Sequence, residues 1–134
     1  MNLSLPESSV LDASVMATLR SLGDPGEPDV YVEVARLFLA DAPIHLSALH
    51  AAIAADSTES VWQIAHRLRG STLEMGAIRM APLYASIEHA ARGGSLEHAA
   101  AQADSLDREF ASARLELEKE IRFHADARQG SSAA

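Results

Sequence analysis

The residues best suited to chemistry surround His66, in the segment Ala65-His66-Arg67-Leu68-Arg69-Gly70-Ser71. A helix turns by about 100° per residue, which places His66 roughly 140° from the centre of this segment's apolar stripe, so its imidazole faces solvent. Gly70 lies one turn further on, although a glycine inside a helix costs about 1 kcal/mol relative to alanine. An exposed histidine beside a cleared position, with Arg67 and Arg69 nearby, is typical of a nucleophile that a bulky partner must reach.

The composition indicates one acidic domain. The chain has 134 residues, is 48% hydrophobic and carries a net charge of -8, which suits a single domain with its own core. The absence of cysteine excludes disulfides and thiolate metal sites. The negative charge argues against nucleic acid and anionic membranes as partners. No signal peptide is visible, and no apolar run approaches the ~20 residues of a membrane span, so we expect a cytoplasmic protein.

Apolar residues recur with helical spacing along most of the chain, and no segment alternates like a strand. The spacing predicts five helices, over about 11–21, 28–53, 58–75, 79–92 and 95–125. Long amphipathic helices joined by short loops form an antiparallel bundle. We therefore expect an all-α fold, an up-down-up-down four-helix bundle with a short additional N-terminal helix. The expected limits are a loose leader over 1–8, the bundle over 9–127 and a disordered tail over 128–134.

The segment around His66 resembles the phosphoacceptor segment of histidine-containing phosphotransfer (Hpt) domains of bacterial phosphorelays. The family pattern is histidine, any residue, an apolar residue, lysine, glycine and serine, followed by a helix end at Gly-Ala. Here the pattern reads His66-Arg67-Leu68-Arg69-Gly70-Ser71 and ends at Gly76-Ala77. Segments 37–43 and 83–92 are similar to the family's flanking segments, and the resemblance covers roughly residues 9–125.

The resemblance implies a role for each matching position. His66 matches the phosphoacceptor, and Gly70 matches the glycine that gives the partner clearance. Glu88 matches a residue whose side chain holds the other ring nitrogen, and Arg92 matches a basic position that supports the site. Arg69 stands where the family usually has a lysine that interacts with the phosphoryl oxygens. Arginine keeps the charge but adds a planar fork, so the exchange is not neutral.

Several nearby residues have both a structural and a functional interpretation. Trp62 and Leu73 lie on the His66 side of their helix, where they either pack under a neighbouring helix or form a docking patch around the histidine. Met16 and Leu19 either close the bundle or extend that patch. Arg67 is either a solvated charge or a docking contact. Arg92, besides the supporting role that the resemblance implies, is either a docking contact or a basic residue that complements the C-terminal dipole of its helix.

The remaining histidines do not follow a metal-binding pattern. His45 and His50 are poorly spaced for one helical face, and no His-Glu-x-x-His motif occurs. The others are His89, His98 and His124. No glycine-rich phosphate loop occurs either, so we expect neither a metal nor another cofactor in this chain. The resemblance implies that the partner receiver domain supplies Mg²⁺.

The resemblance implies a monomeric phosphocarrier that is not an enzyme in its own right. It would accept a phosphoryl group on His66 from a receiver aspartate and pass it to another response-regulator receiver. The expected partners are receiver domains and a hybrid sensor histidine kinase. Two alternatives remain open at this point. One is the phosphoacceptor domain of a chemotaxis-type kinase, and the other is a helical adaptor that binds receivers without being phosphorylated.

Overall fold

The computed structural model describes residues 11–22, 29–75 and 77–133. The leader expected over 1–8 and the turn residue Gly76 lie outside them. The described residues form five helices and no strand, which confirms the all-α fold class. The helices are α2 (Ala13–Ser21), α3 (Val30–Ala54), α4 (Thr58–Met75), α5 (Ala81–Arg92) and α6 (Ala99–Ala133).

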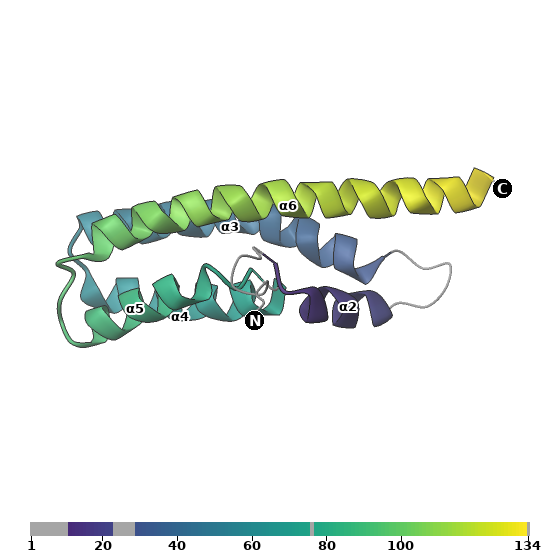
Figure 1. The fold of residues 1–134 in the computed structure, drawn as a ribbon. Coiled ribbons are helices and arrows are strands. Elements are labelled where there is room, and N and C mark those ends of the chain that lie inside the picture. Colours follow the sequence, from purple (N-terminus) through teal and green to yellow (C-terminus); the bar gives the residue numbers. More distant parts are fainter. Residues whose placement is uncertain (1–10, 23–28, 76, 134) are drawn as a thin grey trace, which may run out of the picture.

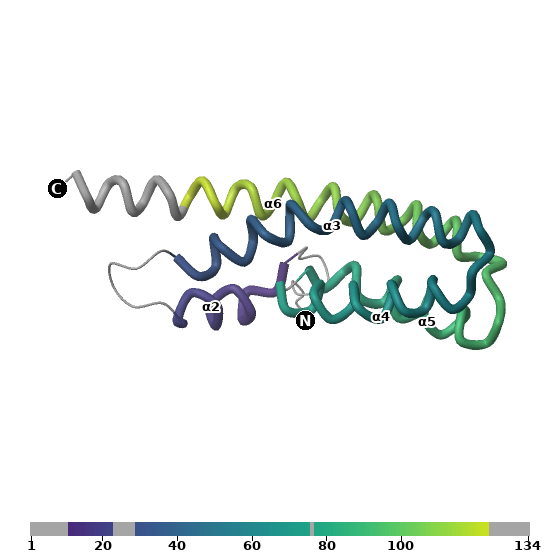
Figure 2. Tube along the Cα trace, turned by 180° about the vertical axis from the view of Figure 1, so that it is seen from behind, coloured from purple at the N-terminus to yellow at the C-terminus, as the bar shows by residue number. Residues whose placement is uncertain are grey.

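Helices α3 to α6 form the antiparallel bundle, and α2 is the additional N-terminal helix (Figure 1). Around the bundle, α4 packs against α3 and α5, and α6 packs against the other side of the same two helices. Helix α2 contacts α3 and α4. Figures 1 and 2 both show that α3 and α6 extend beyond α4 and α5 at the end where α2 lies. The α4–α5 pair and the α3–α6 pair therefore form opposite sides of the bundle.

Two helix ends are defined by residues in the left-handed backbone region. Asp56 has φ 56° after α3, and the Ser57 amide donates to the Ala52 carbonyl at 3.1 Å. Gly94 has φ 85° after α5. Such a residue lets the chain turn back while the last helical carbonyls still accept hydrogen bonds. These two turns set the antiparallel course of α4 relative to α3 and of α6 relative to α5.

The buried stripe predicted for the histidine helix is confirmed. The buried residues of α4 are Val61, Ala65, Leu68, Thr72 and Met75. Thr72 is the polar member of this stripe, and its hydroxyl hydrogen-bonds the side chain of Tyr84 on α5. Burial raises the pKa of the Tyr84 hydroxyl, so this phenol stays neutral inside the core. Since the stripe fixes how α4 is rotated, it also fixes which residues of α4 face outward.

The last helix differs from the prediction at both ends. It begins at Ala99 rather than near Ser95, whose hydroxyl instead accepts from the Glu97 amide at 3.4 Å in the preceding turn. It also continues to Ala133, through the region where a disordered tail was expected over 128–134. Elongation adds one backbone hydrogen bond per residue once a helix has formed. No proline follows residue 95 to stop it.

Helix α3 needs separate mention because its length and composition alone would allow it to cross a membrane. Seven of its side chains are buried: Tyr31, Ala35, Phe38, Ala42, Leu46, Leu49 and Ala52. They join the bundle core formed with α4, α5 and α6. A helix of a bundle core meets the same two criteria as a membrane helix, so length and composition alone do not separate the two.

The core can be tested with two leucines of α3. Leu49 is fully buried, whereas Leu37 is 63% exposed. We expect Leu49→Ala to lower the free energy of unfolding by about 2–5 kcal/mol, because it removes buried methyl groups and leaves a cavity. Leu37→Ala makes the same chemical change at the surface and should cost less than about 0.5 kcal/mol. Urea unfolding followed by circular dichroism measures both, and equal losses would contradict the assignment of the core.

Candidate functional site

The site is built on the antiparallel pair α4 and α5. Trp62 and His66 lie one turn apart on α4, and Glu88 and Arg92 lie one turn apart on α5. Residues four apart share one face of a helix. Because the helices run in opposite directions, His66 meets Glu88 and Trp62 meets Arg92. Two side-chain contacts, one helical turn apart, therefore join α4 and α5 at this position.

His66 is exposed at one ring nitrogen and held at the other. Its side chain is 56% exposed, and its Nδ1 lies 3.0 Å from Oε2 of Glu88. A carboxylate can only accept hydrogen bonds, so Nδ1 carries the proton and donates it to Oε2. In the neutral ring, Nε2 then keeps its lone pair. The geometry thus presents a nucleophilic nitrogen on the outer side of α4.

Glu88 is a buried carboxylate in contact with three basic side chains. Its side chain is only 9% exposed. Besides His66, it accepts from Nε of Arg92 at 3.1 Å through Oε2. A buried carboxylate without such partners would be strongly unfavourable, because burial removes its hydration. Arg92, together with Arg69, thus makes it possible for a charged carboxylate to lie under the histidine.

The two arginines hold Glu88 unequally. Arg92 donates a hydrogen bond to Oε2, whereas Arg69 brings a guanidinium nitrogen to 3.3 Å from Oε1 as an ion pair. The Arg69 contact lacks the alignment of a hydrogen bond, and Oε1 is buried with no hydrogen-bond partner. Arg69 is therefore near enough to offset the negative charge of Glu88, but its side chain is less firmly fixed than that of Arg92.

Trp62 lies against Arg92. The guanidinium carbon of Arg92 is 4.1 Å from the centroid of the indole ring, a cation–π distance. The indole is partly buried against the bundle core. Both residues were predicted as docking residues, and their contact with each other was not predicted. Their positions, one turn before His66 and one turn after Glu88 on antiparallel helices, are the signal that could have indicated it.

The space beside Gly70 is open. A Cβ atom added to Gly70 would meet no heavy atom within 4 Å, leaving aside its chain neighbours and the nearby backbone of its own helix. Neighbouring side chains and helices therefore do not require glycine at this position. Since Gly70 follows His66 by one turn on the outer side of α4, the cleared volume faces whatever approaches the histidine.

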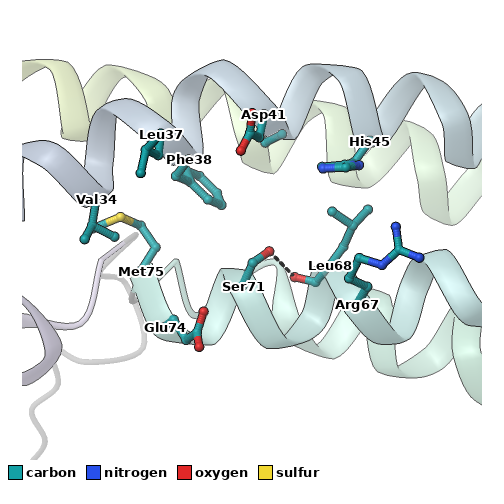
Figure 3. Close-up of a pocket in the computed structure, with 11 residues that line it drawn as sticks. Val34, Leu37, Phe38, Asp41, His45, Arg67, Leu68, Ser71, Glu74 and Met75 are labelled. Carbon is teal, nitrogen blue, oxygen red and sulfur yellow. Dashed lines mark hydrogen bonds between the residues drawn. The ribbon is translucent and has the colours of Figure 1, made fainter.

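The other predicted docking residues line two separate grooves or pack against the core. Arg67 lines a cleft of about 220 Å³ between α3 and α4 (Figure 3). Leu73 and Leu19 line a groove between α4 and α2. Met16 is partly buried against the core. Leu73 follows His66 by about two turns and is 48% exposed, so it extends the His66 face of α4 toward α2. Arg67 instead faces the cleft toward α3.

His50 belongs to a different cluster of side chains. His50 on α3 lies with Asp104 and Asp107 of α6, and the three side chains bring possible ligand atoms within 4.8 Å of one another. His50 and Asp107 contact each other at 2.9 Å and are well exposed, as a surface ion pair. This group lies on the α3–α6 side, opposite the α4–α5 pair that carries His66.

Comparisons with known proteins agree with this geometry. The model of the Hpt domain family matches residues 33–122, which include the whole site from Trp62 to Arg92. Histidine-containing phosphotransfer protein B from Pseudomonas aeruginosa is 30% identical, with a TM-score of 0.79 over 86% of this chain and 96% of its own.

A more distant solved structure, histidine-containing phosphotransfer protein MtHPt2 from Medicago truncatula, is 21% identical and has the same fold. Its TM-score is 0.70, over 88% of this chain and 85% of its own. A search of curated protein sequences found no match. The family match, together with the structural likeness, shows that the chain belongs to the Hpt domain family, the histidine phosphotransfer proteins of phosphorelays.

Proposed function

We propose that His66 accepts a phosphoryl group on Nε2 from the aspartyl phosphate of one receiver domain and passes it to the aspartate of another. The observation that carries this proposal is the hydrogen bond from Nδ1 to the buried Glu88, at 3.0 Å, beneath an exposed ring. It leaves Nε2 unprotonated and accessible. No other histidine whose side chain the structure describes combines a buried carboxylate under Nδ1 with a cleared position one turn away.

The proposed step exchanges one bond to phosphorus for another. The Nε2 lone pair attacks the phosphorus in line, a P–N bond forms, and the P–O bond to the receiver's aspartate breaks, which releases its carboxylate. The ring becomes positive while Nδ1 keeps its proton, and Glu88 offsets that charge. Such transfer depends mainly on positioning and electrostatics. The receiver would supply Mg²⁺, so this chain needs no cofactor of its own.

Arg69 has the best position to stabilise the transferred group. It follows His66 by about one turn, and its ion pair with Glu88 is not a full hydrogen bond. A phosphoryl group brings roughly two negative charges near neutral pH. We propose that Arg69 then turns from Oε1 of Glu88 to the phosphoryl oxygens, while Arg92 stays on Oε2. The planar fork of arginine suits two parallel hydrogen bonds to such a group.

We further propose that the chain acts as a monomeric carrier in the cytoplasm, between a hybrid sensor histidine kinase and a response regulator. The receiver would dock along the outer side of α4, with Gly70 beneath it and Arg67, Leu73, Leu19 and Met16 at its edges. The open Gly70 position and the clefts lined by Arg67 and Leu73 support this approach.

The first test concerns the acceptor. His66→Gln should abolish phosphoryl uptake from a phosphorylated receiver and leave the helical content unchanged, because the side chain is exposed. The parent protein should carry one acid-labile, base-stable phosphoryl group. His98→Gln, at an exposed histidine away from α4, serves as the control and should transfer normally. If His66→Gln still took up the phosphoryl group, His66 would not be the acceptor. If the parent protein bound the receiver without becoming phosphorylated, the adaptor alternative would be favoured.

The second test concerns clearance at Gly70. Gly70→Ala should stabilise the protein by up to about 1 kcal/mol, since alanine favours the helix and its Cβ meets no neighbour. Gly70→Gln should also fold, but it should slow transfer because its longer side chain occupies the receiver's approach. Thermal unfolding and single-turnover transfer measure the two effects. Transfer by Gly70→Gln at the parent rate would rule out steric access as the reason for this glycine.

The third test concerns Arg69. Arg69→Ala should slow transfer at least about tenfold, which corresponds to about 1.4 kcal/mol of transition-state stabilisation. Arg69→Lys should remain closer to the parent because it keeps the charge. Arg108→Ala removes an exposed arginine of α6 and serves as the control. The transfer rate is measured from one phosphorylated receiver at fixed ionic strength. If Arg69→Ala changed this rate by less than about twofold, Arg69 would be only a solvated surface charge.

A further inference from the structure

The chain's single tryptophan, Trp62, is placed to restrict Arg92. Its indole is partly buried against the core, and the Arg92 guanidinium lies over its ring at 4.1 Å. The flat guanidinium stacks on an aromatic face and is attracted by the electron density there. Because one ring face is covered by Arg92, that face is not open to a docking partner.

Arg92 uses its face and its edge for different contacts. The face rests on Trp62, while Nε at the edge donates to Oε2 of Glu88 at 3.1 Å. The same oxygen accepts from Nδ1 of His66 at 3.0 Å. Oε2 is therefore held from two sides, and its position under the histidine depends on where Arg92 points.

We propose that Trp62 is a positioning residue for phosphotransfer and not a receiver-docking residue. By stacking on Arg92 it fixes Oε2 of Glu88, and Glu88 in turn keeps the proton of His66 on Nδ1. This inference rests on the proposed role of His66 as phosphoacceptor. If Oε2 moves, the proton loses its acceptor and shifts to Nε2, which removes the lone pair from the attacking nitrogen.

The first readout is the tautomer of His66, measured by nitrogen NMR on ¹⁵N-labelled protein. The parent should be protonated at Nδ1 in the neutral ring, and Trp62→Leu should gain the Nε2-protonated form. Trp62→Phe keeps an aromatic face and should lie nearer the parent. An unchanged tautomer in Trp62→Leu overturns the proposal. This readout needs no phosphoryl transfer, so it is distinguishable from a failure of His66 to accept the group.

The parent protein alone gives a second readout, which holds even if Trp62→Leu does not fold. The Cδ protons of Arg92, next to the guanidinium that lies over the indole, should be shifted upfield by the ring current, and the absence of that shift overturns the proposal.

A double-mutant cycle separates positioning from docking. Trp62→Leu should lower the maximal single-turnover rate about two- to fivefold, as expected for loss of an exposed cation–π contact. The receiver concentration for half-maximal rate should not change. In the Arg92→Gln background, Trp62→Leu should not lower the rate further, because Trp62 acts on Glu88 only through the Arg92 guanidinium. Additive losses, or a raised half-maximal concentration, would assign Trp62 to docking or packing and overturn the proposal.

Discussion

The buried carboxylate of Glu88 is the group on which the site depends. Removing a carboxylate from water is costly unless charge and hydrogen bonds replace its hydration. Here the replacement consists of Nδ1 of His66 and the guanidinium groups of Arg92 and Arg69. Each of these contacts also constrains the basic partner. The same interactions that make the burial of Glu88 tolerable therefore orient the imidazole and keep two positive charges beside it.

The bundle makes this arrangement possible because it fixes α4 against α5. The buried stripe of α4 sets its rotation, and the Thr72–Tyr84 contact joins the two helices inside the core. On the outer side, the same register brings His66 to Glu88. A rotation of α4 by one residue would turn the imidazole by about 100° and separate the pair. The chemistry of the exposed histidine thus depends on the apolar face opposite it.

The sequence was sufficient for features that repeat along one helix. The apolar spacing predicted which side chains of α4 are buried and that His66 is exposed, because both follow from one helical period. Contacts between α4 and α5 were harder to predict, since they depend on the register that the connecting turn imposes, where the Met80 amide donates to the Ala77 carbonyl at 3.1 Å. The Trp62–Arg92 stacking was missed for that reason. Arg67 was grouped with Arg69 by proximity in sequence, yet it lines the cleft toward α3.

The central claim is that a buried carboxylate selects which nitrogen of His66 reacts. It is tested most directly by locating the phosphoryl group in ¹⁵N-labelled protein after phosphorylation by a receiver. Coupling between ³¹P and ¹⁵N identifies the bonded nitrogen. The account predicts coupling to Nε2 of His66, with Nδ1 still protonated and hydrogen-bonded to Glu88. A phosphoryl group on Nδ1 of His66, or on any other histidine, would contradict it.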